Sequence, residues 1–351
     1  MSRIAIIGSG AWGTALAISL AHERGHRKDG RGTHSITLWS HTAAVADSIA
    51  QSRENRTYLP GYTVPDAVQP TADLAQALAS AEIVIGVMPS AHVHAIYTSM
   101  APHLKRAQVI VSATKGIVSS DFEVMRYQRV SEVIGEVIGD ALGQRALPCA
   151  VLSGPSFAQE VAAGQPAAMT IACADTALAA RLQEELSGPT LRLYTNDDVI
   201  GVELGGSLKN VIAIATGIVA GLGLGHNSAA ALITRGIAEI TRLAVACGGR
   251  RETMAGLAGL GDLVLTCTGE LSRNRRVGIE LGKGHRLGDI LNGMGGRVAE
   301  GVLTTRAALG LAAAHGIEMP ITAQVDAILH GSKSPREAVA ELMRRPGRDE
   351  L

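Results

Sequence analysis

Gly8-Ser9-Gly10-Ala11-Trp12-Gly13 has the spacing GxGxxG and stands between an apolar run (residues 4–7) and a stretch of helical periodicity (13–22). A short apolar run that ends at glycine is typical of a buried strand. Glycines in this strand–helix context allow a tight turn, the approach of a pyrophosphate to the backbone, and close packing of helix on strand. The helix N-terminus then offers free N–H groups to phosphates. We therefore predict a Rossmann-type dinucleotide site that uses Gly8, Gly10 and Gly13.

Further apolar runs extend this pattern along the first half of the chain. They lie at residues 35–39, 83–88 and 109–113, with a further strand pair at 151–152 and 168–172. Strands of this kind separated by helical stretches are typical of a mainly parallel sheet covered on both faces. The polar, glycine-rich segment 26–34 is predicted as a surface loop.

The character of the sequence changes after about residue 199. Alanine, leucine and glycine dominate, strand signals fade, and long helical patterns follow one another. Polar, cap-forming residues at 196–198 precede this stretch. We predict an α/β Rossmann domain over 1–196, an all-α catalytic domain over 197–345 and a polar tail over 346–351.

Composition excludes several classes of function. Lys+Arg and Asp+Glu are equal at 32 each, which argues against a nucleic-acid partner. The four cysteines are scattered without a CxxC pair, so we expect neither a metal site nor disulfides. The N-terminus runs into a strand rather than a signal peptide, and the apolar stretch 211–224 is too short and glycine-rich to cross a bilayer. We therefore expect a cytoplasmic protein without an integral membrane segment.

The end of the second predicted strand bears on the choice of cofactor. Trp39-Ser40-His41 contains no acid to hold the adenine ribose hydroxyls. A neutral or partly cationic pair, Ser40 and His41, suits a 2′-phosphate, although both could be ordinary loop residues. The sequence favours NADP(H) and leaves NAD(H) open. Lys115 follows the fourth strand, where it either faces the ligand crevice or is a solvated surface lysine.

The helical half contains candidate residues for chemistry on a substrate. Lys209 and Asn210 lie on an apolar helix, where burial disfavours a charged lysine and suits it to exchange a proton. The alternative is a lysine whose ammonium group reaches solvent. Asp262 could orient Lys209 or accept a substrate hydroxyl. Arg273, with Ser272 and Asn274 beside it, can bind a phosphate.

Two patches are less specific when considered from their residues alone. The segment 153–158 places small residues and a proline between a strand and a helix start, which exposes backbone donors but also fits a plain turn. Glu300 could bind the nicotinamide ribose or amide, or be a surface glutamate. The apolar helical domain makes a homodimer the expected assembly.

Taken together, these motifs resemble the bacterial NAD(P)-dependent glycerol-3-phosphate dehydrogenases over nearly the whole chain. The similar segments are GSGAWGTALA (8–17), SATKG (112–116), SGPSFAQE (153–160), ELGGSLKNVIAIATG (203–217), GLGDLVLTC (259–267), SRNRRVG (272–278) and AEGVLTT (299–305). The loop at 26–34 is longer than the usual link in this family, and the arginine that often stands near Ser40 and His41 is missing.

The resemblance implies roles for individual residues. Lys209 would be the catalytic proton acceptor, and glycerol 3-phosphate would also contact Lys115, Gly154, Ser156, Asp262, Ser272, Arg273 and Asn274. The cofactor site would include Ala11, Trp12, His41, Lys115, Ala158, Arg273, Val298 and Glu300. The implied reaction is reversible reduction of dihydroxyacetone phosphate to sn-glycerol 3-phosphate, which supplies glycerophospholipid synthesis.

Two other readings stay open. A related two-domain dehydrogenase could act on a 3-hydroxy acid or ketopantoate, but those carboxylate substrates leave the Ser272–Asn274 phosphate anchor without a purpose. A non-catalytic dinucleotide sensor would not need Lys209, Asn210 and Asp262.

Overall fold

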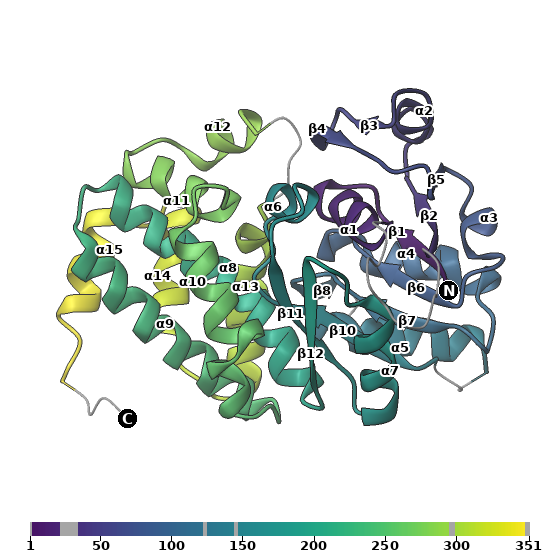
Figure 1. Cartoon of the computed structure of the whole chain (residues 1–351). Helices are drawn as coiled ribbons and strands as arrows, with labels where there is room; N and C mark the ends of the chain where they lie inside the picture. Colours follow the sequence, from purple (N-terminus) through teal and green to yellow (C-terminus); the bar gives the residue numbers. More distant parts are fainter. Residues whose placement is uncertain (1, 22–33, 122–124, 144–146, 295–298, 348–351) are drawn as a thin grey trace. The chain divides into compact units, whose positions relative to one another are not determined.

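The computed structural model describes residues 2–21, 34–121, 125–143, 147–294 and 299–347 (Figure 1). It contains two compact units: residues 1–118 and 128–203 form the first, and residues 119–127 and 204–351 form the second. Most of the predicted loop at 26–34, Val298 and the end of the tail lie outside the described residues.

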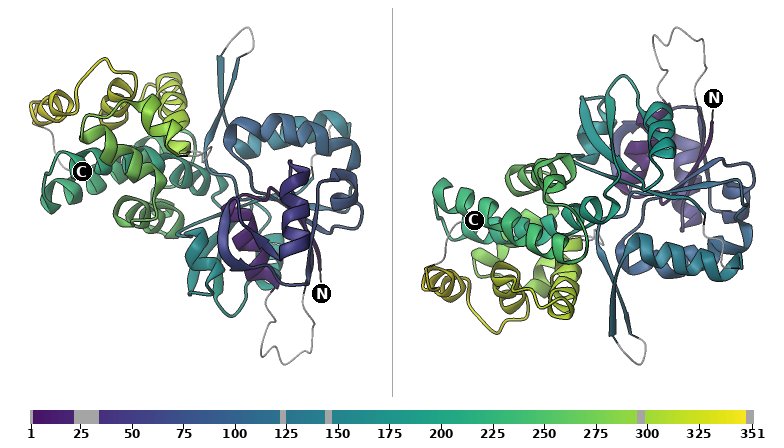
Figure 2. Two further views of the ribbon diagram at one scale, coloured as in Figure 1. Left: turned by 90° about the horizontal axis from the view of Figure 1, so that it is seen from above. Right: turned by 90° about the horizontal axis from the view of Figure 1, so that it is seen from below.

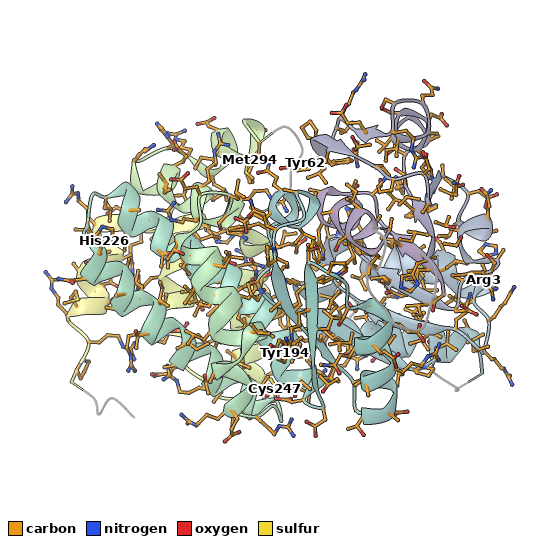
Figure 3. The ribbon with its side chains drawn as sticks, viewed as in Figure 1. Arg3, Tyr62, Tyr194, His226, Cys247 and Met294 are labelled. Atoms are coloured by element: carbon orange, nitrogen blue, oxygen red, sulfur yellow. The ribbon has the colours of Figure 1, made fainter. Side chains whose placement is uncertain are left out.

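The first unit is built on an eight-stranded sheet of order β12-β11-β10-β7-β6-β1-β2-β5. Its strands are β1 (Arg3–Ile7), β2 (Ser35–Trp39), β5 (Val68–Thr71), β6 (Ile83–Gly86), β7 (Val109–Ser112), β10 (Cys149–Ser153), β11 (Ala167–Ala172) and β12 (Leu191–Asn196). The paired strands are parallel, except that β10 and β11 are antiparallel. The predicted strands are confirmed, and β5 and β12 are additional edge strands. Tyr194 of β12, labelled in Figure 3, is 45% exposed at one edge.

Helices cover both faces of this sheet, as the two views of Figure 2 show. One face packs against α1 (Ala11–Ala21), α2 (Ala43–Ser52), α6 (Ala158–Ala162) and α7 (Thr176–Leu186), and the other against α3 (Leu74–Leu78), α4 (Val93–Met100) and α5 (Val130–Ala141). In β1, Ile4 and Ile6 contact the first helix layer, whereas Ala5 and Ile7 contact the second. Because successive side chains point to opposite faces that are both buried, the central strands β1, β6 and β7 consist largely of continuous apolar runs.

Shorter elements complete this half of the chain. They are β3 (Glu54–Asn55) and β4 (Leu59–Thr63), which pair with each other, the pair β8 (Ile117–Asp121) and β9 (Met125–Arg129), and the short helices η1 (Ser90–His92) and η2 (Ala101–His103).

The second unit is helical from residue 204 onward, where the described residues contain no strand; its other segment, 119–127, contains parts of β8 and β9. Its elements are α8 (Val199–Gly221), α9 (His226–Ala246), η3 (Glu252–Ala255), η4 (Leu257–Gly261), α10 (Asp262–Thr268), α11 (Arg273–Gly282), α12 (Leu287–Asn292), α13 (Glu300–Ala314), α14 (Pro320–Leu329) and α15 (Pro335–Met343). The fold class is therefore the predicted one, an α/β Rossmann domain followed by an all-α domain.

The units divide the chain differently from the boundary expected at 196/197. Glu203, in the second turn of α8, accepts hydrogen bonds from Arg129 Nη1 at 2.9 Å and from the Ser131 backbone N–H at 2.9 Å, which ties this end of the helix to the first unit. Tyr127 belongs to the second unit, where its ring lies only 2.0 Å from the position that a Cβ on Gly310 would occupy. Contacts between residues far apart in sequence thus join segments that the expected boundary would separate, such as Arg129 with Glu203.

Helix α8 is the most apolar long element. Among the described residues it is the one helix with the length and composition to cross a membrane, yet 89% of its most apolar window is buried inside the protein. Burial of this extent by protein is what a core helix of a globular domain shows.

Candidate active site

Each glycine of the β1–α1 turn stands there for a different reason. Gly8 has φ +124°, and a Cβ there would lie 1.9 Å from the Val87 carbonyl oxygen. A Cβ on Gly13 would lie 1.9 Å from the Gly8 carbonyl oxygen. A Cβ on Gly10, by contrast, would meet no atom within 4 Å. Gly8 and Gly13 are thus required by packing, whereas Gly10 leaves the backbone open to a ligand.

Helix α1 begins at Ala11, immediately after this open position. The geometry of a helix leaves the N–H groups of Ala11, Trp12 and Gly13 without an intrahelical acceptor, and no acidic residue stands in this first turn, which suits an anion. Trp12 is half-buried, and its indole Nε1 is a buried donor without a hydrogen-bond partner. Together these groups fit the pyrophosphate and polar atoms of a dinucleotide.

The turn is also held by hydrogen bonds from other elements. Ser9 Oγ donates to Ser40 Oγ at 2.8 Å, which joins the turn to the end of β2. Asn55 Nδ2 donates to the Ser9 carbonyl oxygen at 2.7 Å and to Thr14 Oγ1 at 2.8 Å. Of the pair expected near an adenine ribose, Ser40 is only 2% exposed, so His41 is the exposed member.

Lys115, Gly154 and Ser156 come together at the carboxyl edge of the sheet. Lys115 Nζ donates to the Gly154 carbonyl oxygen at 2.9 Å and lies 3.5 Å from Ser156 Oγ. Ser156 Oγ donates to the same carbonyl at 3.0 Å. Because β7 and β10 are parallel neighbours, the segments that follow them meet at one edge. Ala158 is the first residue of α6, just beyond this cluster.

Lys209 and Asp262 form a buried ion pair in the second unit. Lys209 is 7% exposed and Asp262 1%, and Lys209 Nζ donates to Asp262 Oδ1 at 2.5 Å. Lys209 Nζ also donates to Thr266 Oγ1 at 2.9 Å, and Thr266 Oγ1 donates to the Asp262 carbonyl oxygen at 2.6 Å. Lys209 is therefore enclosed rather than directed to solvent. The carboxylate offsets the cost of burying its charge and fixes where the ammonium group lies.

The cysteine next to this cluster is held in its protonated form. Burial raises the pKa of the Cys267 thiol to about 12, so the thiol is protonated at neutral pH. The described residues also contain no group of three or more His, Cys, Asp or Glu side chains that could hold a metal ion.

The segment 272–274 forms the start of α11, and two of its side chains hold the helix in place whereas the third is exposed. Ser272 caps the helix, because its Oγ accepts from the Arg275 N–H at 3.2 Å. Asn274 is buried, donates to Asn210 Oδ1 at 2.9 Å and accepts from the Gly301 N–H at 2.9 Å. Arg273, the first residue of α11, is exposed. Asn274 thereby links three helices, α8, α11 and α13.

Glycines bring α8 and α11 into close contact. A Cβ on Gly217 would lie 2.1 Å from the Arg275 carbonyl oxygen, and a Cβ on Gly278 would lie 2.1 Å from the Ile214 carbonyl oxygen. Gly221 and Gly282 form a second such contact one turn further along. The contacts advance in the same order along both helices, which therefore run in the same direction. This contact holds the start of α11 beside Asn210.

Glu300 is half-buried at the first position of α13, whereas Val298 lies outside the described residues. Two further residues at these sites were not predicted. Thr266 could have been found, because it stands one helical turn after Asp262 on the same face of α10. Asn55 left no signal, because its partners lie 41 and 46 residues away.

Comparison with known proteins identifies the family of both halves of the chain. The family models for the N-terminus and C-terminus of NAD-dependent glycerol-3-phosphate dehydrogenase match residues 3–179 and 198–340. A protein named glycerol-3-phosphate dehydrogenase [NAD(P)+] from Acidobacterium capsulatum is 62% identical, with all of both chains covered. One of the same name from Koribacter versatilis is 58% identical over all of this chain and 99% of its own.

A solved structure is similar over the same length. The crystal structure of glycerol-3-phosphate dehydrogenase from Coxiella burnetii has a TM-score of 0.87 and 42% identity, covering 98% of this chain and 99% of its own. The chain therefore belongs to the family of NAD-dependent glycerol-3-phosphate dehydrogenases, which are oxidoreductases.

Proposed function

We propose that this protein catalyses the reversible NAD(P)H-dependent reduction of dihydroxyacetone phosphate to sn-glycerol 3-phosphate, with Lys209 exchanging the proton. The observation that carries the proposal is the buried cluster in which Asp262 and Thr266 bind Lys209 Nζ. A ketone that accepts hydride develops negative charge on its oxygen, so a positioned proton donor lowers the barrier. In the reverse direction the same lysine accepts the proton of the alcohol.

The substrate phosphate requires an anchor that places C2 for reaction. Arg273 is exposed at the N-terminus of α11, where its guanidinium and the helix dipole both favour an anion. Ser272 and Asn274 flank it and add neutral donors. Lys115, Gly154 and Ser156 form the substrate contacts proposed for the first unit, supported by their hydrogen-bonded cluster.

The cofactor, when bound, supplies the hydride. We assign its pyrophosphate to the turn of Gly8, Gly10, Ala11, Trp12 and Gly13, supported by the open side of Gly10. His41, Lys115, Ala158, Arg273, Val298 and Glu300 are proposed as the further cofactor contacts. With no acid at the end of β2 and His41 exposed there, we propose a preference for NADP(H) over NAD(H).

The wider assignments follow from the same reaction. We propose a metal-independent cytoplasmic enzyme, assembled as a homodimer, without a nucleic-acid partner or an integral membrane segment. Its product would supply glycerophospholipid synthesis.

The test is absorbance at the reduced-nicotinamide band with purified protein, dihydroxyacetone phosphate, and NADPH or NADH in parallel. We expect oxidation that requires the substrate and is faster with NADPH. Unphosphorylated dihydroxyacetone is the matched control, and it should react poorly because it lacks the anchor. Oxidation with ketopantoate instead would contradict the proposed substrate. Cofactor binding without oxidation of any substrate would favour a sensor.

A further inference from the structure

We infer that Asn55 is a positioning residue for the cofactor: its buried amide fixes the Gly8–Gly13 turn in the shape that receives a pyrophosphate. The inference rests on the proposed dinucleotide site and deepens it, because Asn55 is outside every motif from which that site was assigned.

The side chain of Asn55 is 1% exposed and uses both ends of its amide. Nδ2 donates to the Ser9 carbonyl oxygen at 2.7 Å and to Thr14 Oγ1 at 2.8 Å, while Oδ1 accepts from the Tyr58 N–H at 3.1 Å. The Ser9 carbonyl can only accept and the Tyr58 N–H can only donate, so these partners fix which way the amide lies.

The bond to the Ser9 carbonyl controls the direction of the next N–H group. The peptide bond between Ser9 and Gly10 is trans and planar, so its C=O and N–H point in opposite directions. Holding the Ser9 oxygen toward Asn55 therefore turns the Gly10 N–H away from Asn55. Gly10 is the position where a Cβ would meet no atom within 4 Å. An N–H fixed beside that open position is suited to donate to a phosphate oxygen.

The bond to Thr14 fixes the other side of the turn. Thr14 is fully buried in the first turn of α1, and its Oγ1 also donates to the Ser9 carbonyl oxygen at 3.2 Å. Asn55, Ser9 and Thr14 thus form a closed set of hydrogen bonds that joins the turn to the helix N-terminus. A turn that is rigid before binding loses less conformational entropy when the cofactor binds.

The position of Asn55 depends on Arg53, two residues before it, whose backbone conformation is rare for a residue with a side chain. Arg53 ends α2 with φ +51°, in the left-handed region. Its guanidinium donates to the carbonyl oxygens of Val64 at 3.1 Å and Val68 at 3.0 Å, and also to that of Pro65. These bonds stabilise the sharp turn that directs Asn55 toward the β1–α1 turn.

The experiment compares isosteric variants by calorimetric titration with NADPH and with NADH. Asn55→Asp keeps the acceptor for Tyr58 but places a carboxylate oxygen against the Ser9 carbonyl. Thr14→Val replaces the hydroxyl with a methyl group and so removes its hydrogen bonds with little change of shape. Asn227→Asp, at an exposed position of α9 in the second unit, is the matched control.

We expect Asn55→Asp to weaken the binding of NADPH and of NADH roughly ten- to thirty-fold, which is the loss of affinity expected from two hydrogen bonds. The two losses should be equal, because the pyrophosphate is common to both cofactors. Turnover at saturating cofactor and the KM for dihydroxyacetone phosphate should stay within about twofold of the values of the unmodified protein. A general loss of stability would not lower cofactor affinity alone in this way. Thr14→Val should weaken binding about threefold, and Asn227→Asp should not change it.

Wild-type affinity in a folded Asn55→Asp variant, judged by its circular dichroism and melting temperature, would overturn the inference. If that variant does not fold, Thr14→Val decides, and unchanged affinity there would overturn it equally. If the unmodified protein binds neither cofactor, the proposed dinucleotide site fails and the inference fails with it. If the unmodified protein binds the cofactors and both variants bind them equally well, the inference about Asn55 is wrong, whereas the proposed dinucleotide site stands.

Discussion

Lys209 and Asp262 illustrate how burial and pairing together define a single residue's chemistry. An enclosed ammonium without a partner would lose its charge, whereas a carboxylate 2.5 Å away stabilises that charge and restricts its position. Removal of either partner leaves the other charge buried and unpaired, which typically costs about 3–5 kcal/mol. Activity and stability therefore have to be measured together.

Replacing Lys209 with Ala should lower turnover about 10²- to 10⁴-fold, the usual contribution of a positioned proton donor. Cofactor affinity should change little, because the cofactor turn is formed by residues 8–13. Turnover and NADPH affinity are measured on the same folded protein. Lys283→Ala is the control, since that lysine is exposed and pairs with Glu280, three residues before it. Near-normal turnover in Lys209→Ala would show that another group exchanges the proton.

Glu239 supports a prediction of pH dependence. Burial raises the pKa of its carboxyl above the ordinary 4.5, although the N–H groups of Ile321 and Thr322 and the Thr322 hydroxyl bind it and offset part of that rise. Between 4.5 and the raised pKa the folded state binds more protons than the unfolded chain. The stability contributed by protonation is therefore present below pH 4.5 and is lost as pH rises through that window.

Urea unfolding of the protein and of Glu239→Gln across pH 4 to 8 measures this effect. The difference between the free energy of unfolding of the unmodified protein and that of Glu239→Gln should fall as pH rises. A difference between them that is constant with pH, or that increases, would contradict the raised pKa.

At the scale of elements, the glycine contact between α8 and α11 positions the proposed phosphate anchor. Gly278→Ala would place a methyl group 2.1 Å from the Ile214 carbonyl oxygen, so the helices must separate. Overpacking of this kind costs about 1–3 kcal/mol. Because α11 begins at Arg273, we also expect a higher KM for dihydroxyacetone phosphate, measured by NADPH oxidation.

Gly139→Ala is the matched control for this variant. Gly139 lies inside α5, where an added Cβ would meet nothing within 4 Å, so alanine should be neutral or stabilise the protein by up to about 1 kcal/mol. Equal effects of the two substitutions on melting temperature and KM would show that the helix contact is not specific.

At the scale of the whole molecule, the chain passes between its two units more than once. Helix α8 runs without a break from Val199 in the first unit to Gly221 in the second, and residues 119–127 belong to the second unit although both flanking segments belong to the first. We expect such shared segments to couple the unfolding of the two units.

We therefore expect one cooperative transition by differential scanning calorimetry. NADPH at about 100 times its Kd should stabilise the whole protein by about 2.7 kcal/mol and shift that transition upward. Two transitions of which only one moves with NADPH would show that the units unfold independently.

The sequence predicted much of the fold because the relevant signals are local. The apolar runs at 4–7 and 109–113 are buried on both faces of a parallel sheet, so neither face required a polar residue to interrupt the pattern. The edge strand β5 was missed, since Val68–Thr71 is short and partly exposed and contains a proline. Gly8 and Gly13 were predicted with their structural reasons, because strand, turn and helix follow one another directly along the chain.

The sequence by itself determined the fold class, the central strands, the glycine turn and the family motifs that contain Lys209 and Asp262. Only the tertiary structure decided which of these residues touch. It placed Lys209 against Thr266, buried Ser40 while leaving His41 exposed, and brought Asn55 to the Ser9 carbonyl. Hydrogen bonds between residues tens of positions apart depend on how helices and strands pack, and packing leaves no periodic trace in the sequence around either partner.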